Sequence, residues 1–258
     1  MSRRAWHRSA LAATSAAMEP PRNPEAHEVI DPELLLLAYR SGVFPMAETR
    51  DDRGIMWIEP RERAIIPLEG LRVSRSLAKV LRQERFTVSC NRAFDEVIEA
   101  CAGPRPWGAG SETDESWISR RIAASYGLLH RLGHAHSVEC WRDGRLVGGL
   151  YGVAFDRVFC GESMFSRDRD ASKVALCWLV AAMREAGMEL LDCQFMTPHL
   201  ASLGAQSMPQ AAYMKRVGLA SRPAEAGPFR SLPDGFHSLC AGASSPGKRI
   251  AQSLTQTS

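Results

Sequence analysis

The sequence contains no apolar run long enough to cross a membrane. Its longest apolar stretch, residues 174–183, falls short of the roughly 18 residues that a transmembrane helix requires, and the apolar run at 34–39 is shorter still. None of its seven cysteines forms a CxxC pair, and most of them lie inside apolar segments. We therefore expect buried free thiols in a reducing cytoplasm, with no disulfide framework, no metal centre and no membrane association.

Motifs of several common enzyme classes are missing as well. The chain has no phosphate loop of the Walker type and no GxGxxG run. Ser163 lies in the segment GESMF and not in a GxSxG nucleophile elbow, which disfavours a serine hydrolase. We expect no cofactor.

Positive charge is concentrated in one region, although the net charge of +3 is mild. The cationic positions of this region are Arg61, Arg63, Arg72, Arg75, Lys79, Arg82 and Arg85. A solvated face is the commoner explanation of such a run, and a binding surface for a polyanion is the alternative.

The composition divides the chain into four segments. Residues 1–29 place three arginines before a run of small residues, which predicts a disordered segment or a start codon assigned too early, with Met18 as the true start. A loop rich in Gly, Pro and Ser at 103–116 suggests a boundary between an N-terminal domain at 30–106 and a second domain at 107–219. Residues 220–258 are expected to form a flexible tail.

The N-terminal segment alternates helices and short strands. Asp31 and Pro32 suit the start of a helix that continues to Tyr39, and Gly42 suits its left-handed stop. The segment 44–46 is expected to form an exposed apolar turn. Further strands are expected at 55–58, 64–67 and 86–90, and further helices at 74–83, 94–102 and 117–132.

The C-terminal segment begins with strands and continues with helices. Residues 135–141 and 146–153 flank Asp143-Gly144, a pair that favours a two-residue hairpin turn. A third strand is expected at 158–160 and a nearly continuous apolar strand at 190–195. Helices are expected at 171–186, 198–204 and 209–218. This order predicts an α+β fold with antiparallel strands and a helix-covered sheet.

Three polar residues stand out within the apolar strands. Asp192 and Gln194 are two apart, so their side chains leave the same face of a strand. Glu162 follows a glycine among apolar and small polar neighbours. A buried carboxylate is costly unless it is paired or used in a site. The structural alternative is an Asp192 satisfied by Lys173, by Arg167 or by a helix terminus.

Two other groups of residues have a structural and a functional interpretation. His134 and His136 are spaced to lie on one strand face and could chelate a metal, but no third ligand is evident, so strand or core histidines are the commoner case. Trp117 and Met46 lie near polar or loop segments, where an aromatic ring can stack on a base, although core packing is the usual role of tryptophan.

Several short motifs together make the chain similar to a known family. They are GVFP at 42–45, VSRS at 73–76, WI at 117–118, LGHAHSVE at 132–139, LVGGLYGV at 146–153, CGESMFSR at 160–167, ASK at 171–173, DCQ at 192–194 and HLASLG at 199–204. In this order the motifs resemble the leucyl/phenylalanyl-tRNA–protein transferases over about residues 30–218.

The resemblance implies a small N-terminal α/β domain that contacts tRNA and a C-terminal catalytic domain with the acetyltransferase-like (GNAT) fold. It implies a cytoplasmic, monomeric enzyme that transfers Leu, Phe or, less well, Met from aminoacyl-tRNA. The acceptors would be proteins with N-terminal Lys or Arg, which the transfer marks for degradation by the N-degron route.

The resemblance also implies roles for particular residues. Asp192 would hold and help to deprotonate the incoming amine, Gln194 would orient the amine and the carbonyl, and Glu162 would supply negative charge. The remaining roles are an aminoacyl pocket of Leu150, Phe159, Met164, Leu179, Met183 and Leu191, adenosine contacts from Trp117 and Met46, and tRNA contacts from Arg72, Arg75, Lys79 and Arg82. The family pattern has Trp at position 46 and Met at position 150, so this chain departs from it at both.

Three alternatives stay open at this point. A related transferase would act on N-terminal Asp or Glu. An acyl-CoA-dependent N-acetyltransferase would need a pyrophosphate-binding Q/RxxGxG/A run, and we find none after the central strands. A binding module for tRNA or for N-degrons would lack turnover altogether.

Overall fold

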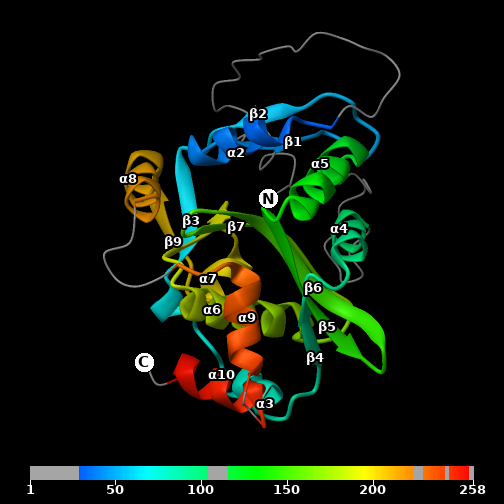
Figure 1. The fold of residues 1–258 in the computed structure, drawn as a ribbon, viewed down its shortest axis with the longest axis vertical. Coiled ribbons are helices and arrows are strands. Elements are labelled where there is room, and N and C mark those ends of the chain that lie inside the picture. Colours follow the sequence, from blue (N-terminus) through cyan, green and yellow to red (C-terminus); the bar gives the residue numbers. More distant parts are fainter. Residues whose placement is uncertain (1–28, 104–115, 223–228, 242–243, 256–258) are drawn as a thin grey trace.

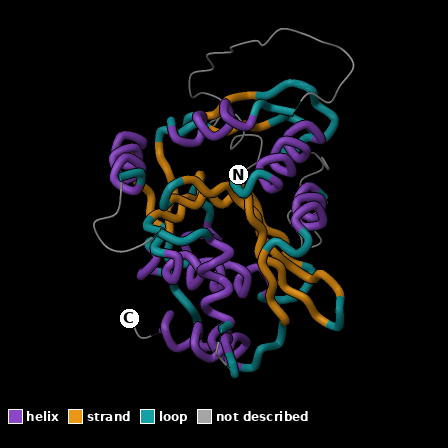
Figure 2. Tube along the Cα trace, viewed as in Figure 1, coloured by secondary structure: helices purple, strands orange, loops and turns teal. Residues whose placement is uncertain are grey.

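The computed structural model describes residues 29–103, 116–222, 229–241 and 244–255 (Figure 1). Its centre is a large mixed sheet, flanked by helices on both faces (Figure 2). In spatial order the strands are β4 (Thr87–Cys90), β5 (Ala135–Arg142), β6 (Arg145–Phe155), β7 (Val158–Ser166), β8 (Leu190–Gln194), β3 (Glu62–Ile66) and β9 (Gln206–Pro209). The pairing of β7 with β8 is parallel, and the other pairings of this sheet are antiparallel.

Smaller elements complete the fold. Strands β1 (Phe44–Met46) and β2 (Met56–Ile58) pair with each other. The helices are α2 (Pro32–Arg40), α3 (Arg75–Arg82), α4 (Phe94–Ala102), α5 (Arg120–Arg131), α6 (Ala171–Ala186), α7 (Pro198–Ser202), α8 (Gln210–Ala220), α9 (Leu232–Cys240) and α10 (Pro246–Thr255), with a 3-10 turn η1 at Leu68–Gly70. In the described ranges no helix has the length and hydropathy needed to span a membrane.

Two adjacent glycines of β6 show how helices approach both faces of the sheet. A Cβ atom at Gly148 would lie 2.5 Å from Cβ of Ala171 on α6, and one at Gly149 would lie 3.4 Å from Cγ2 of Val97 on α4. Because successive residues of a strand face opposite sides, α6 and α4 lie on opposite faces. The helices thereby enclose two hydrophobic clusters, one around α6 and one beneath α2, α4 and α5.

The turn and cap chemistry expected from the sequence is confirmed. The Asp31 side chain accepts hydrogen bonds from the backbone N–H groups of Glu33 and Leu34, at 2.9 and 3.0 Å. Gly42, with φ of +77°, follows the end of α2. Asp143 and Gly144 both have positive φ, 51° and 74°, as a primed hairpin turn between β5 and β6 requires.

The structure corrects two expectations about local structure. Residues 44–46 form strand β1, not an exposed turn, and Phe44 is fully buried. In the segment 220–258, expected as a flexible tail, the chain forms α9 and α10 (Figure 1). Apolar residues recur on one side of each, and Phe236 and Ile250 join the core around α6. Burial of these faces orders the segment.

Residues on either side of the expected domain boundary at 103–116 contribute strands to one sheet. β3 and β4 come from the segment 30–106, yet β3 pairs with β8 and with β9, and β4 pairs with β5. The molecule is therefore an α+β protein with a large mixed sheet to which both segments contribute strands. A division into two domains and a GNAT-like catalytic fold stay predictions.

Candidate active site

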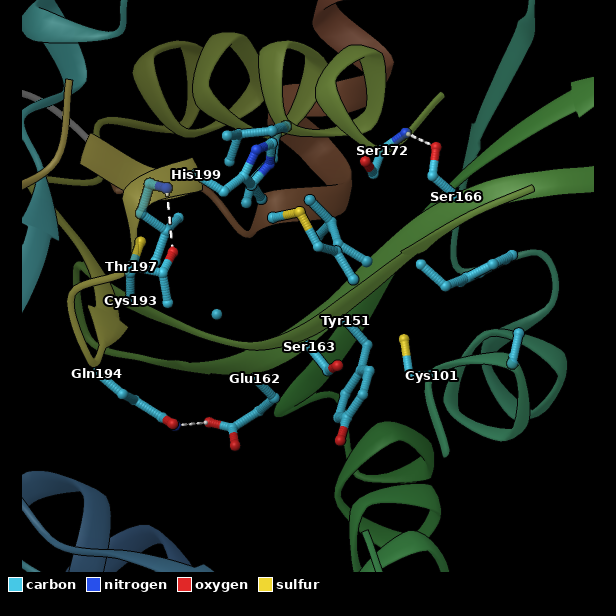
Figure 3. Close-up of a pocket in the computed structure, with 18 of the residues that line it drawn as sticks. Cys101, Tyr151, Glu162, Ser163, Ser166, Ser172, Cys193, Gln194, Thr197 and His199 are labelled. Carbon is cyan, nitrogen blue, oxygen red and sulfur yellow. Dashed lines mark hydrogen bonds between the residues drawn. The ribbon is translucent and has the colours of Figure 1, made fainter. Parts of the chain in front are cut away.

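A cavity of about 1430 Å³ opens beside the middle of the sheet (Figure 3). One wall is the second half of β7, where the consecutive residues 161–167 line the cavity. α6 contributes Ser172, Leu176 and Leu179, and the segment after β8 contributes residues 197–200. A volume of this size exceeds the roughly 300–1,000 Å³ of an ordinary small-ligand pocket. It suits a large substrate, or two substrates side by side.

The cavity arises because β7 and β8 separate. These parallel strands pair only at Val158 with Leu190, Phe159 with Leu191, and Cys160 with Asp192. Beyond this point the β6–β7 register shifts by one residue, because Gly152 lies opposite Gly161 whereas Tyr151 lies opposite Ser163. Glu162 is the extra residue of this bulge. Bulges bend a strand and redirect a side chain, and here the bulge directs Glu162 toward β8.

Glu162 and Gln194 meet at one end of the cavity. Gln194 Nε2 donates to Glu162 Oε1 at 2.8 Å, and Figure 3 shows the two side chains pointing toward each other. The Tyr126 hydroxyl donates to Glu162 Oε2 at 3.1 Å and lies 2.5 Å from the Tyr39 hydroxyl. The sequence prediction that Glu162 and Gln194 lie in one site is consistent with this geometry.

Burial changes the proton affinity of Glu162. The residue is only 8% exposed. This burial raises the pKa of Glu162 from 4.5 to about 7, although hydrogen bonds from Tyr39, Gln194 and Tyr126 act in the opposite direction. The group therefore changes charge near neutral pH, which suits a proton acceptor.

Asp192 lies behind the cavity wall and does not line it. Both of its oxygens are occupied: Oδ2 accepts from Arg63 and from the Tyr213 hydroxyl, and Oδ1 accepts from the backbone N–H of Gln194 at 2.9 Å. Arg63 and Asp192 form an ion pair that is 1% and 0% exposed. Burial alone would lower the pKa of Arg63, but the Asp192 carboxylate keeps it raised.

Arg63 is the partner that the sequence did not identify. The sequence suggested Lys173, Arg167 or a helix terminus as the structural partner of the Asp192 carboxylate. The actual ion-pair partner lies on β3, far away in the chain. The Arg63 guanidinium also faces the rings of Phe44 and Tyr213 at 5.2 and 4.4 Å. In the sequence Arg63 is one of a run of cationic residues, and nothing local distinguishes it from its exposed neighbours.

The residues expected for an aminoacyl pocket separate into two groups. Leu150, Met164, Leu179 and Leu191 line the cavity. Phe159 and Met183 are fully buried and lie outside its lining, so they support the wall from behind. Leu176, one turn before Leu179 on α6, lines the same apolar side and was not predicted.

The two residues expected to contact adenosine lie on the cavity wall. Trp117 and Met46 both line it, and the backbone N–H of Ala47 donates to the Trp117 carbonyl at 3.1 Å. This bond connects β1 to the segment before α5, so residues far apart in sequence form one side of the opening. At this position Met46 contributes a thioether side chain and no aromatic ring.

The remaining expected residues lie elsewhere. Arg72, Arg75, Lys79 and Arg82 are exposed at and before α3, outside the cavity lining. His136 lies next to Asn91, whose Nδ2 is 3.0 Å from Nδ1 of the ring, and burial lowers the pKa of His136 to about 4. Within the described ranges no three His, Cys, Asp or Glu side chains are grouped as metal ligands.

The fold and site together define an α+β protein whose sheet separates between β7 and β8. In that gap an apolar slot lies beside the carboxylate of Glu162 and the amide of Gln194. Residues 28–61 match the model of the leucyl/phenylalanyl-tRNA protein transferase N-terminal domain, and residues 65–218 match that of leucyl/phenylalanyl-tRNA protein transferase. The chain belongs to the leucyl/phenylalanyl-tRNA protein transferase family, and it is an aminoacyltransferase.

Individual relatives support this assignment. A leucyl/phenylalanyl-tRNA–protein transferase of Novosphingobium aromaticivorans is 56% identical over 89% of this chain and 97% of the relative. Another, of Rhizorhabdus wittichii, is 53% identical over 75% of this chain and 76% of the relative.

Solved structures give a weaker comparison. The L-PGS structure from Bacillus licheniformis is 13% identical and reaches a TM-score of 0.31 over 80% of this chain and 62% of the other. So low a TM-score carries no argument about fold or function.

Proposed function

We propose that this aminoacyltransferase moves Leu, Phe and, less well, Met from aminoacyl-tRNA to the α-amine of proteins that begin with Lys or Arg. The product would be marked for degradation by the N-degron route in the cytoplasm. The observation that carries the proposal is the position of the apolar slot, formed by Leu150, Met164, Leu179 and Leu191, in the same cavity as the hydrogen-bonded pair of Glu162 and Gln194.

The reaction needs little beyond positioning and removal of a proton. In aminoacyl-tRNA the amino acid is an ester and is already activated, so the acceptor amine can attack its carbonyl carbon directly. A carbon–nitrogen bond forms, the ester carbon–oxygen bond breaks, and the ribose hydroxyl of the terminal adenosine leaves with a proton. The enzyme holds the amine against the ester, and this proximity supplies much of the rate.

We assign the proton of the attacking ammonium to Glu162. The α-amine of a protein has a pKa of about 7.7–8.0, close enough to the raised pKa of about 7 for proton transfer in either direction. The Gln194 amide, bonded to Glu162 at 2.8 Å, would orient the amine and the ester carbonyl. Tyr126 holds the second carboxylate oxygen.

Asp192 would act through Gln194 and not on the substrate. Its carboxylate is buried with Arg63 and accepts the backbone N–H of Gln194, which has an unusual positive φ of 61°. That bond favours a backbone conformation which L-residues otherwise seldom adopt. Asp192 is therefore a positioning residue that directs the Gln194 side chain toward Glu162.

The slot supports a preference for apolar amino acids. It offers only hydrocarbon and thioether surface, so a charged or polar side chain would lose its hydration without gaining a partner. Because one methylene changes binding by roughly 1–3 kcal/mol, such a slot separates Leu, Phe and Met only modestly. Leu150, where the family pattern has Met, changes the width of this slot.

The charge at the rim supports a cationic acceptor. The exposed carboxylates of Glu96 and Glu99 on α4 line the cavity, and Glu99 pairs with Arg50 at 2.5 Å. Because Arg50 offsets the charge of Glu99 and the exposed Arg167 also lines the cavity, attraction of an N-terminal Lys or Arg side chain would rest mainly on Glu96. On the other side of the opening, Trp117 would pack on the terminal adenosine.

A transfer assay tests the proposal. Radiolabelled Leu-, Phe- and Met-tRNA are each incubated with the protein and with matched peptides that begin with Arg, Lys, Asp or Ala. We expect label in the Arg and Lys peptides, with Met-tRNA the poorest donor. Label in the Asp peptide alone would establish the alternative acceptor class.

The variant Asp192→Asn separates catalysis from binding. We expect turnover to fall by at least tenfold while tRNA binding is retained, because the variant disturbs the Gln194 backbone and leaves the outer surface unchanged. Circular dichroism checks that the variant is folded. Full turnover in Asp192→Asn would overturn the positioning role.

A further inference from the structure

The cavity contains a strand edge that the fold leaves unpaired. β7 extends to Ser166, but β8 pairs with it only as far as Cys160. The residues of β7 beyond that point line the cavity continuously, and Figure 3 shows Glu162 and Ser166 at opposite ends of this stretch. At about 3.3 Å per residue, the edge from Glu162 to Ser166 is roughly 13 Å long. An aminoacyl group is too short to cover it.

The pairing register shows which backbone groups face the cavity. The N–H of Arg167 donates to the Val147 carbonyl at 2.7 Å, so Ser166 and Gly148 between them form a non-hydrogen-bonded pair. The backbone N–H and C=O of Ser166 therefore point away from β6. Two residues earlier, those of Met164 point the same way.

These groups have no backbone partner in the described part of the chain. The strand pairings of β7 beyond Glu162 are all with β6, and no turn or loop hydrogen bond reaches Met164 or Ser166. Buried backbone groups are normally paired, so an unpaired strand edge on a cavity wall is a site for an incoming strand. Main-chain hydrogen bonds then supply the affinity.

We propose that the first three residues of the acceptor protein add to this edge as an extended strand, parallel to β7. The inference rests on the proposed function, because that function places the acceptor amine at Glu162. With the amine at that end, the acceptor chain runs toward Ser166, which is the direction of β7 itself. Antiparallel addition would place the amine at the wrong end of the cavity.

Parallel pairing fixes which acceptor groups are bound. In a parallel ladder one residue bonds to the two neighbours of the residue opposite it. With acceptor residue 1 opposite Ser163, its carbonyl accepts the N–H of Met164. Acceptor residue 3 then lies opposite Phe165: its N–H donates to the Met164 carbonyl, and its carbonyl accepts the N–H of Ser166. The N–H of acceptor residue 2 points away from β7.

This mode of binding separates two kinds of recognition. The carboxylates around the cavity would recognise the charge of the first acceptor residue, whereas the strand edge would bind only the acceptor backbone. An enzyme that binds its acceptor in this way tolerates any side chain at positions 2 and 3, provided that the segment is extended and the third N–H is free. Proline at position 3 would remove that donor.

Backbone-modified peptides test the proposal without changing the enzyme. Three peptides that begin with Arg and share one sequence are compared: unmodified, N-methylated at residue 2, and N-methylated at residue 3. The readouts are kcat and KM for transfer of radiolabelled Leu from Leu-tRNA. N-methylation at residue 3 removes one hydrogen bond and introduces a clash, so we expect kcat/KM to fall by about tenfold or more. N-methylation at residue 2 should change kcat/KM by less than about threefold.

The outcomes separate this inference from the proposed function. Transfer to the unmodified peptide with no loss on either methylation shows that the acceptor does not use the edge. Equal loss on both methylations contradicts the parallel register. No transfer to the unmodified peptide overturns the proposed function, and the inference fails with it.

Discussion

At the scale of single residues, the site depends on where two carboxylates are placed. Glu162 and Asp192 are both buried, but only Glu162 lines the cavity. Asp192 has a guanidinium beside it, and Glu162 has only hydroxyl and amide donors. Asp192 lies in a buried ion pair with Arg63, whereas burial raises the pKa of Glu162 to about 7. We therefore expect the two acids to differ in role because they differ in partner.

Activity and stability should depend on pH in opposite directions through Glu162. The folded-state pKa is raised from 4.5 to about 7. The stability that the neutral carboxyl contributes is therefore fully present below pH 4.5 and is lost as pH rises through about 7. The difference corresponds to about 3 kcal/mol across this window. Turnover should rise over the upper part of the same window, because the ionised form accepts the proton.

The variant Glu162→Gln tests this dependence. We expect its unfolding free energy, measured by urea denaturation at a series of pH values, to lack the decline between pH 4.5 and 7. Its kcat/KM should be at least tenfold lower and should lose the rise near pH 7. Glu59→Gln changes an exposed carboxylate outside the cavity lining; it is the matched control and should keep both pH profiles. If the unfolding free energy of Glu162→Gln declined between pH 4.5 and 7 as that of the wild type does, the decline would belong to another titrating group.

The sequence could predict part of this site and not the rest. Asp192 and Gln194 stand out because polar residues interrupt an apolar strand, and Glu162 stands out because it follows a glycine. The role of Arg63 could not be predicted, since its contact with Asp192 depends on β3 lying next to β8. The bulge at Glu162 could not be predicted either, because it depends on the pairing register of β6 with β7 and not on the sequence of either strand alone.

At the scale of elements, local patterns predicted helices and hairpins well. Helix α4 has the expected limits, 94–102, and α6 spans the expected 171–186 and is followed by Gly187 at a φ of 74°. These elements are fixed by periodicity and by their caps. β9 was missed because Gln206–Pro209 has no apolar alternation, and it exists only because β3 offers it an edge. Long-range pairing of this kind has no local signal.

The contact between α9 and α6 provides a prediction at this scale. Gly235 on α9 allows close packing, because a Cβ there would lie 2.3 Å from the Ala182 carbonyl oxygen and 2.9 Å from Cβ of Ala186. Gly235→Ala should therefore force α9 away from α6 and destabilise the protein by about 1–3 kcal/mol. A lower thermal midpoint, by roughly 2–4 °C for each kcal/mol, is the expected readout.

Gly218 is the matched control. It lies in α8, it is exposed, and no atom lies within 4 Å of the position of its added Cβ. Gly218→Ala should stabilise the protein by about 0.5–1 kcal/mol, because alanine is the better helix former. A midpoint that rises in both variants would show that α9 does not pack on α6 as described, and that the C-terminal segment adds little to the core.

At the scale of the whole molecule, chemistry and anchoring of the tRNA would use different surfaces. The cavity is formed by β7, α6, α4 and the segments around Trp117, whereas α3 lies outside it. α10 packs on α3 and helps to bury its apolar stripe, including Leu77 and Leu81. The cationic side of α3 is left to solvent. The fold thereby presents a basic surface that is separate from the proposed catalytic residues, which is consistent with the predicted tRNA contacts.

A charge reversal on α3 tests this separation. Arg75 is exposed in the first turn of α3, and Arg75→Glu should weaken tRNA binding by about tenfold at moderate salt. Each lost phosphate contact should also reduce the slope of log K against log salt by about 0.7–0.9. Fluorescence anisotropy of labelled tRNA at several salt concentrations measures both quantities. Circular dichroism should show an unchanged fold, because the side chain is not packed.

Arg216→Glu makes the same charge change elsewhere and serves as the control. Arg216 is exposed on α8, which lies well apart from α3 (Figure 1). If binding depends on the surface of α3, Arg216→Glu should keep the wild-type affinity and salt slope. If affinity depends only on net charge, the two variants should lose affinity equally. An equal loss would therefore contradict the α3 assignment, and a loss confined to Arg75→Glu would show that the tRNA is anchored away from the cavity where its ester reacts.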